Sequence, residues 1–203
     1  MCQTQAPVTG AQTELSHVFK HIAASAVLAA GLFATSLAAA ADRITIELKD
    51  GPVVIELNDK APQHAARIKE LAAAGEYDNV AFHRVIEGFM AQTGDVEFGD
   101  MADGYRANRA GTGGSSEPDL KAEFTDQPFE RGTVGMARAQ SPDSANSQFF
   151  IMFGDGSFLN GQYTVVGHVV SGMENVDKIK LGDEAANGMV DNPDRMIKVT
   201  VGE

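Results

Sequence analysis

The stretch FHRVIEGFMAQTGD, residues 82–95, decides the fold of this chain. Its apolar residues follow one another closely, as in a buried β-segment, but Arg84 and Gln92 are set among them. A charge among apolar side chains costs free energy unless a partner compensates it. Alternation would place Arg84, Met90 and Gln92 on one face, although Glu87-Gly88 interrupts the pattern. These residues alone allow two interpretations of Arg84: a salt bridge to one of many carboxylates, or a functional arginine.

The length and charge of the chain limit its class. Its 203 residues fit one domain of ordinary size or two small ones. The formal net charge is −12, and basic residues form no cluster beyond isolated pairs. A negative field of this kind favours solubility and repels nucleic acid and anionic lipid. We therefore expect no nucleic-acid binding.

The first 41 residues differ from the rest. Residues 22–41 are uncharged and rich in Ala and Leu, Lys20 precedes them, and small residues stand near their end. This layout predicts a secretory signal peptide that is cleaved near Ala40 or Ala41. The alternative is an anchor that stays in the membrane, because a membrane span needs about 20 apolar residues. We expect cleavage, and no stable membrane association after it.

Cleavage would leave residues 42–203 as one mature domain. Residues 1–19 match neither a signal nor a fold. Removing Glu14 and Lys20, one charge of each sign, keeps the net charge at −12. Cys2, the only cysteine, goes with the leader. Disulfides, thiolate catalysis and Cys-zinc sites are therefore excluded from the mature domain.

Several kinds of active site are missing from the sequence. It contains no G-x-S-x-G, P-loop, H-E-x-x-H or EF-hand motif. GTGG, residues 111–114, neither follows a clear strand nor opens a helix, so it predicts a tight turn. The histidine spacing resembles no metal site, and we expect neither a metal nor a cofactor. Ser144 or Ser147 can be drawn into a triad with His83 and Asp95, and a hydrolase that uses Ser147 and His83 is a remote alternative.

Local patterns predict the first elements of the mature domain. RITIEL (43–48) and PVVIEL (52–57) alternate apolar with polar residues around an Asp-Gly pair, which predicts a β-hairpin. Apolar residues then recur at helical spacing, which predicts a helix over 61–74. We expect Asp59 to cap this helix and Gly75 to end it.

The remaining segments are mostly strand-like. A loop rich in Gly, Asp, Ser and Asn follows the opening stretch, over residues 94–121. Seven or eight short strands and two helices favour a mainly β fold, with an antiparallel sheet closed into a barrel and helices covering its ends. Beyond the first hairpin, strands are predicted over 80–86, 89–94, 132–137, 147–153, 163–170 and 195–201, and a second helix over 173–180.

Four motifs then occur in an order that resembles a known family. They are FHRVIEGFMAQTGD, GTGG, GTVGMARAQSPDSANSQFFIMF (132–153) and FLNGQYTVVGHV (158–169). This pattern resembles the cyclophilin peptidyl-prolyl cis–trans isomerases over nearly the whole mature chain. With the leader and MARAQSPDSANSQFF, it is most similar to exported, periplasmic bacterial members. The resemblance implies a closed eight-stranded antiparallel β-barrel capped by two α-helices.

The resemblance also implies a set of site residues. The family's essential arginine falls on Arg84, and Gln92 lies beside it. The resemblance implies a proline pocket of Phe89, Met90, Phe150 and Leu159, and substrate-groove residues Ala137, Arg138, Gln148, Phe158 and Tyr163.

Some of these positions depart from the family pattern. Phe158 replaces a tryptophan that is typical of many eukaryotic members, so tight binding of cyclosporin is not implied. Tyr163 stands where a histidine is common, and Arg138 where many members have asparagine. Glu87 replaces a conventional proline at a predicted bend. None of these changes removes the arginine or the pocket.

The implied activity is isomerisation of X–Pro bonds in unfolded or flexible chains, in support of the folding of exported proteins. The expected partners are proline-containing peptides and such chains, and the expected oligomeric state is a monomer. The competing hypothesis is a non-catalytic peptide-binding or chaperone module that uses the same groove.

Overall fold

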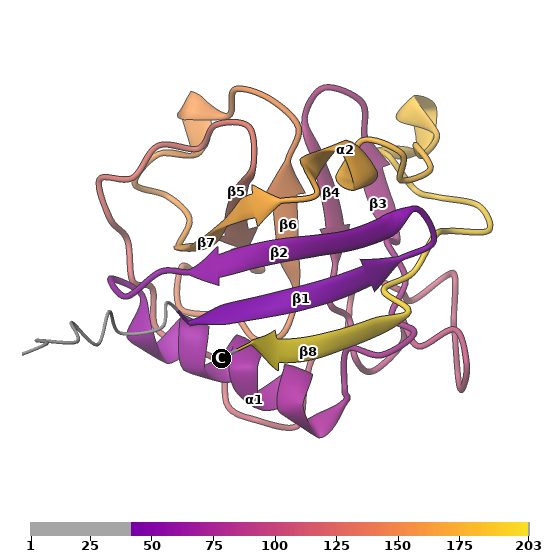
Figure 1. Ribbon diagram of the computed structural model, residues 1–203, viewed down its shortest axis with the longest axis horizontal. Helices are drawn as coiled ribbons and strands as arrows, with labels where there is room; N and C mark the ends of the chain where they lie inside the picture. Colours follow the sequence, from indigo (N-terminus) through magenta and orange to yellow (C-terminus); the bar gives the residue numbers. More distant parts are fainter. Residues whose placement is uncertain (1–41, 203) are drawn as a thin grey trace, which may run out of the picture. The chain divides into compact units, whose positions relative to one another are not determined.

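The computed structural model describes residues 42–202 and is mainly β (Figure 1). The leader predicted at residues 1–41 lies outside the described residues. Two α-helices, α1 (Pro62–Ala74) and α2 (Met173–Val176), and two short 3₁₀ helices, η1 (Ser157–Leu159) and η2 (Glu184–Ala186), accompany the sheet. The eight strands are β1 (Arg43–Leu48), β2 (Gly51–Leu57), β3 (Arg84–Ile86), β4 (Met90–Thr93), β5 (Thr133–Met136), β6 (Phe149–Met152), β7 (Val165–Ser171) and β8 (Lys198–Gly202).

All eight strands belong to one antiparallel sheet in the order β3-β4-β6-β5-β7-β2-β1-β8. The predicted closed barrel is wrong, because the ladders within residues 42–202 do not join β3 to β8. Irregular chain runs along the edge instead: Val85 N donates to Gly188 O at 2.8 Å, and Ile197 N donates to Glu47 O at 2.8 Å. The sheet is therefore an open half-barrel whose gap is bridged by the segment between η2 and β8.

The predicted hairpin is confirmed. β1 and β2 pair in register from Arg43↔Glu56 to Leu48↔Gly51, with Lys49 and Asp50 as the connection. Gly51 adopts φ 131°, a region that L side chains rarely enter. The Asp-Gly pair thus reverses the chain where the sequence predicts it.

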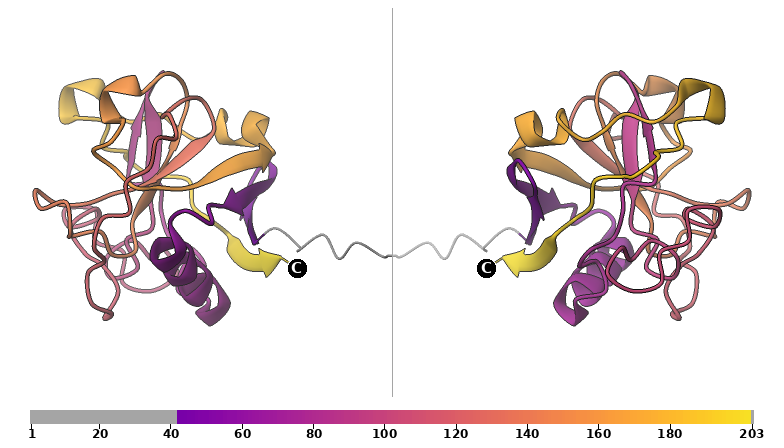
Figure 2. Two further views of the ribbon diagram at one scale, coloured as in Figure 1. Left: turned by 90° about the vertical axis from the view of Figure 1, so that its left-hand side faces the viewer. Right: turned by 90° about the vertical axis from the view of Figure 1, so that its right-hand side faces the viewer.

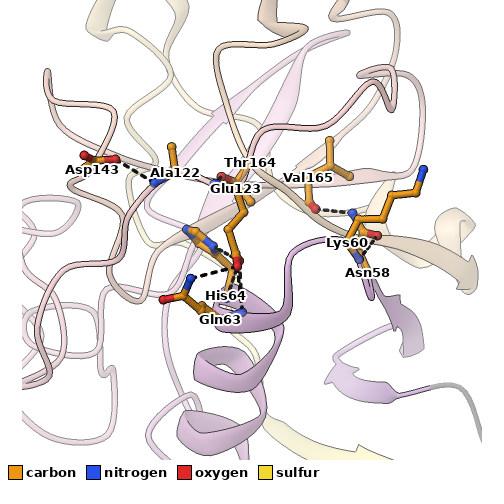
Figure 3. Close-up of polar contacts among 9 residues, drawn as sticks. All are labelled: Asn58, Lys60, Gln63, His64, Ala122, Glu123, Asp143, Thr164 and Val165. Atoms are coloured by element: carbon orange, nitrogen blue, oxygen red, sulfur yellow. Dashed lines mark hydrogen bonds and ion pairs between the residues drawn. The ribbon is translucent and has the colours of Figure 1, made fainter.

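Helix α1 has the predicted span, but its N-terminus is held differently. Asp59 does not cap it; Ala61 is the N-cap and provides no side-chain acceptor. The carboxylate of Glu123, from the long loop between β4 and β5 (residues 94–132), accepts hydrogen bonds from Gln63 N and His64 N at 3.1 Å each (Figure 3). The same carboxylate lies 2.7 Å from His64 Nδ1. At the other end, Gly75 stops the helix in the left-handed conformation, as predicted.

The helices lie at opposite ends of the curled sheet (Figures 1 and 2). Helix α2 is shorter than predicted, because Lys178 N and Ile179 N bond three residues back after Val176. Val176 and Ile179 are nevertheless buried, as the predicted face requires. No helix within residues 42–202 is long and apolar enough to cross a membrane.

Buried apolar residues form two clusters. The larger one joins the inner face of the sheet to α1 and α2. The smaller one lies around β4, β6 and η1, next to the opening stretch of the sequence, and consists of Met90, Phe129, Phe150, Met152, Leu159 and Val165. This second cluster forms the floor of the candidate site.

Candidate active site

The opening stretch forms a tight hairpin that places Arg84 opposite Gln92. Strands β3 and β4 pair in register as Arg84↔Gln92 and Ile86↔Met90. A three-residue connection separates the strands, with Gly88 at φ 70°. An odd-numbered connection keeps the alternation in phase, so Arg84, Met90 and Gln92 share one face. The interruption at Glu87-Gly88 therefore does not break the pattern.

A chain of side-chain hydrogen bonds runs from Arg84 across the sheet. Arg84 Nη1 donates to Gln92 Oε1 at 3.3 Å, and Gln92 Nε2 donates to Gln148 Oε1 at 3.0 Å. Gln148 Nε2 in turn donates to Gly113 O at 2.8 Å, in the GTGG turn. The chain connects the arginine to the long loop and fixes both glutamine side chains.

Arg84 makes no salt bridge within residues 42–202, so the ion-pair interpretation of this residue is wrong. Its other close acceptors are neutral: Nε donates to Asn187 O at 3.0 Å, and Nη2 donates to Asn187 Oδ1 at 3.1 Å. Burial lowers the pKa of Arg84, and the nearby Tyr163 raises it by a smaller amount. The guanidinium nonetheless stays charged at any physiological pH, and no carboxylate neutralises it.

Aromatic and apolar side chains lie beside the guanidinium. Phe150 stacks on Phe129 at 5.8 Å between ring centroids, and Tyr163 meets Phe150 edge-on at 5.9 Å. Met90 and Leu159 belong to the same cluster. Arg84 Nη1 approaches the Met90 sulfur at 3.9 Å, which brings the charge to the margin of this apolar surface.

The rim of the apolar surface is open to solvent. Phe89 is partly buried and lies 5.5 Å from the ring of Phe158, between centroids. Phe158 is 62% exposed. The apolar surface therefore continues outward from the buried cluster along these two rings.

A cavity of about 520 Å³ begins at Gln92, the hydrogen-bond partner of Arg84. Gln92, Ala137, Arg138 and Gln148 line it, together with residues 111–115 of the long loop. Four predicted site residues thus meet around this hollow, whereas Arg84, Phe158, Tyr163 and the four proline-pocket residues do not line it.

Arg138 holds two walls of the site together. Its Nη2 donates to Gln162 O at 3.0 Å and its Nη1 to Ala139 O at 2.9 Å. The guanidinium also lies over the Tyr163 ring, 4.4 Å from its centroid. The Arg138 side chain thus connects the segment that follows β5 to the segment that follows η1.

Other candidate chemistry does not come together. Ser147 is fully buried, and its hydroxyl donates to Gly94 O at 2.7 Å. Both ring nitrogens of His83 lack a hydrogen-bond partner within residues 42–202. Burial lowers the pKa of His83 to about 4. Without a Ser147–His83 contact, the hydrolase alternative has no base to activate the hydroxyl.

Sequence reasoning missed two residues of this site. Phe129 stacks under Phe150, but nothing in its local pattern separates it from any other loop residue. Asn187 holds Arg84, and its only local signal is the following glycine, since Asn-Gly pairs mark turns.

The fold and site define a mainly β protein with a charged arginine at the margin of an apolar cluster, and comparisons with known proteins agree. The family model described as cyclophilin-type peptidyl-prolyl cis–trans isomerase matches residues 43–201. A probable peptidyl-prolyl cis–trans isomerase from Brucella suis is 61% identical, covering 92% of this chain and 97% of the relative. Peptidyl-prolyl cis–trans isomerase B of Escherichia coli is 36% identical, covering 79% of this chain and 99% of the relative.

Solved structures agree at the level of the fold. A cyclophilin from Hirschia baltica is 24% identical with a TM-score of 0.65, covering 78% of this chain and 73% of that one. A Cryptosporidium parvum cyclophilin-type isomerase, crystallised in the presence of the dipeptide Ala-Pro, is 24% identical with a TM-score of 0.67, covering 79% and 99%. The chain belongs to the cyclophilin-type peptidyl-prolyl cis–trans isomerases, and its activity is the isomerisation of X–Pro peptide bonds.

Proposed function

We propose that Arg84 is the catalytic residue of this isomerase and that Phe89, Met90, Phe150 and Leu159 hold the proline ring. The observation that carries the proposal is a guanidinium whose acceptors within residues 42–202 are all neutral, at the margin of an apolar surface. Gln92, Ala137, Arg138, Gln148, Phe158 and Tyr163 would contact the peptide on either side of the proline.

The reaction needs a group that stabilises a twisted amide. Rotation about an X–Pro bond loses amide resonance, and the barrier is ~18–20 kcal/mol. In the twisted state the prolyl nitrogen becomes pyramidal and exposes a lone pair. A charged donor directed at that nitrogen binds the twisted state more strongly than the planar one, and only such differential binding accelerates the step.

Arg84 has donors to spare for this role. An arginine carries five N–H groups, and Asn187 and Gln92 take three of them. One Nη2 N–H remains, together with an Nη1 N–H that meets only the weakly accepting sulfur of Met90. These two N–H groups are available to a bound amide.

One arginine and one apolar pocket can together supply the free energy that such a rate acceleration requires. An acceleration of roughly 10⁵-fold requires about 7 kcal/mol at ~1.36 kcal/mol per decade. One preorganised donor in a dry site supplies ~3–4 kcal/mol of this. The remainder would come from holding the proline ring while the preceding residue rotates, and from excluding water.

The test measures kcat/KM for isomerisation of a proline-containing tetrapeptide. Arg84→Ala should lower kcat/KM by about 10²–10³-fold, the usual effect of removing one preorganised donor. The kcat/KM of Arg84→Lys should lie between those of wild type and Arg84→Ala, because lysine keeps the charge and loses the planar fork. Arg43→Ala is the matched control, because Arg43 is an exposed residue of β1 that pairs with Glu56 of β2. Equal rates for wild type and Arg84→Ala would end this assignment.

We further propose that the enzyme is exported to the periplasm and assists the folding of exported chains there. The apolar, uncharged segment over residues 22–41 supports export. N-terminal sequencing of the protein from the periplasmic fraction should find a start near Ala41 or Asp42. A protein that stays in the cytoplasm with its N-terminus intact would contradict the proposal.

A chaperone role through the same groove is the second candidate function. The 62% exposed Phe158 beside Phe89 favours it, because exposed aromatic surface binds apolar segments without any rotation. Under this role, Arg84→Ala would suppress aggregation of an unfolded client as well as wild type does. Phe158→Ser would lose that effect, and its kcat/KM on a short tetrapeptide would fall less than that of Arg84→Ala.

A further inference from the structure

Arg84 is held on one side by a loop that is distant in sequence. Asn187 lies 103 residues further along the chain, and its backbone and side-chain oxygens accept from Nε and Nη2 of the same guanidinium. Two acceptors on one residue fix both the position and the rotation of a planar guanidinium. Gln92 alone, bonded at Nη1, would fix neither.

The loop that carries Asn187 is itself closed by backbone hydrogen bonds. Asp183 N donates to Met189 O at 2.9 Å, and Gly188 N donates to Asp183 O at 2.8 Å. The Asp183 carboxylate also accepts from Ala185 N at 2.9 Å and caps η2. Asn187 is thus presented by a preformed turn.

The conformation at Asn187 is one that few residues accept. Its φ is 56° and its ψ is 36°, the left-handed region in which glycine and asparagine occur most readily. The next residue, Gly188, packs against β3 so closely that a Cβ would collide with Ile86. This close approach brings Asn187 within hydrogen-bond distance of Arg84.

The acceptors are neutral, which matters for a charged catalytic group. An aspartate or glutamate in the same place would hold the guanidinium at least as firmly, but it would also cancel part of the field at the prolyl nitrogen. An amide provides the hold without the opposing charge.

We propose that Asn187 is a positioning residue that orients the Arg84 guanidinium toward the prolyl amide, and that its neutral side chain preserves the charge of Arg84. The inference rests on the proposed catalytic role of Arg84. It assigns Asn187 an effect on kcat and little effect on substrate binding, because its two oxygens bond Arg84 and Asn187 is not among the residues proposed to contact the peptide.

Two variants of Asn187 separate the parts of the inference. Asn187→Gly keeps the left-handed backbone and its carbonyl acceptor, and removes only Oδ1. It should lower kcat roughly 10-fold, the loss expected for one hydrogen bond to a charged group, with KM within about twofold of wild type. Asn187→Asp keeps the acceptor and adds a charge, and it should also lower kcat with little change in KM.

A matched control comes from the same segment. Asn192 is also left-handed, at φ 48°, and has no bond to Arg84 among residues 42–202. Asn192→Gly should leave kcat and KM unchanged. A thermal melt of each variant checks that the fold is intact. If the substitutions acted only by loosening the segment, kcat would fall in both Asn187→Gly and Asn192→Gly.

A spectroscopic measurement reports on Arg84 directly. Side-chain ¹⁵N NMR follows rotation about the Nε–Cζ bond, with the signal assigned by its loss in Arg84→Lys. Rotation should be faster in Asn187→Gly than in wild type and unchanged in Asn192→Gly. Wild-type kcat and wild-type rotation in Asn187→Gly would overturn the positioning role even if Arg84→Ala is inactive. An active Arg84→Ala would instead overturn the catalytic assignment.

Discussion

At the residue scale, the site depends on a charge that the protein holds without neutralising. Arg84 is half-buried, yet its partners are the oxygens of Asn187 and Gln92. Burying a charge costs free energy, and carboxylates are plentiful in a chain of net charge −12. A carboxylate partner would offset that cost, but it would also weaken the field that the reaction uses.

Gln92→Glu tests the need for a neutral partner. A carboxylate about 3.3 Å from Nη1 would form an ion pair with Arg84, and we expect kcat/KM to fall about 10-fold or more. Gln140→Glu is the control, because Gln140 is exposed and its substitution adds the same charge at a residue that has no bond to Arg84 within residues 42–202. The tetrapeptide assay measures both variants. If Gln92→Glu were as active as wild type, the charge on Arg84 would not be the catalytic factor.

At the scale of the element, α1 shows how a helix can form without a local cap. Pro62 at the first position and Gly75 at the end are local signals, and both are where the sequence predicts. The acceptor for the free N–H groups comes from Glu123, about 60 residues away along the chain, and a hydrogen bond from His64 completes its surroundings (Figure 3). The long loop is thereby fastened to α1.

Glu123→Gln should destabilise the protein by about 1 kcal/mol at neutral pH, the usual contribution of a helix cap. Burial raises the pKa of Glu123. Hydrogen bonds from the His64 ring and from the backbone N–H groups of His64 and Gln63 together outweigh the effect of burial and hold the pKa below its ordinary value. The carboxylate therefore contributes fully above its unfolded-state pKa of about 4.3. The contribution is lost as the pH falls through the lower folded-state pKa.

Urea unfolding at pH 7 and at pH 3 measures this effect as the difference between Glu123→Gln and wild type. The difference should be largest at pH 7 and smaller at pH 3. Taking the difference removes the separate acid sensitivity of buried His83, which is common to both proteins. Glu117→Gln changes an exposed loop carboxylate and should show no difference at either pH. An equal deficit at both pH values would contradict the role of the charged cap.

The same contrast between local and distant contacts explains what the sequence could predict. The first hairpin, α1 and the shared face of Arg84, Met90 and Gln92 depend on residues a few positions apart, so periodicity and turn residues were sufficient. The contacts of Glu123 and Asn187 link segments 60 and 103 residues apart, and no local pattern predicts such pairs. The proposed roles of the site residues came from the family resemblance, since a pocket phenylalanine and a core phenylalanine have the same local pattern.

At the scale of the whole molecule, the open edge of the half-barrel is the main departure from the predicted fold. Strand β3 is short and forms the edge of the sheet beside the site. Val85 N donates to Gly188 O, and Gly182 N donates to Val85 O at 2.9 Å. The segment that closes the gap thus also carries Asn187, so the closure of the fold and the orientation of Arg84 depend on the same contacts.

Gly188→Ala tests this coupling. Gly188 has φ 80°, and an added Cβ would collide with the side chain of Ile86. Overpacking of this kind costs about 1–3 kcal/mol, to which the left-handed backbone adds about 1 kcal/mol. Gly104→Ala is the control, because Gly104 has φ 87° and open space around its Cβ position, and therefore shows the backbone cost alone.

Hydrogen exchange at the Val85 amide gives the local readout. In Gly188→Ala this amide should exchange faster and kcat should fall, because the loop that carries Asn187 can no longer approach β3. In Gly104→Ala both should match wild type, apart from a small loss of global stability. If Gly188→Ala weakened the fold but left Val85 exchange and kcat unchanged after correction for that loss, closure and catalysis would be independent. The proposed link between the bridging segment and Arg84 would then be wrong.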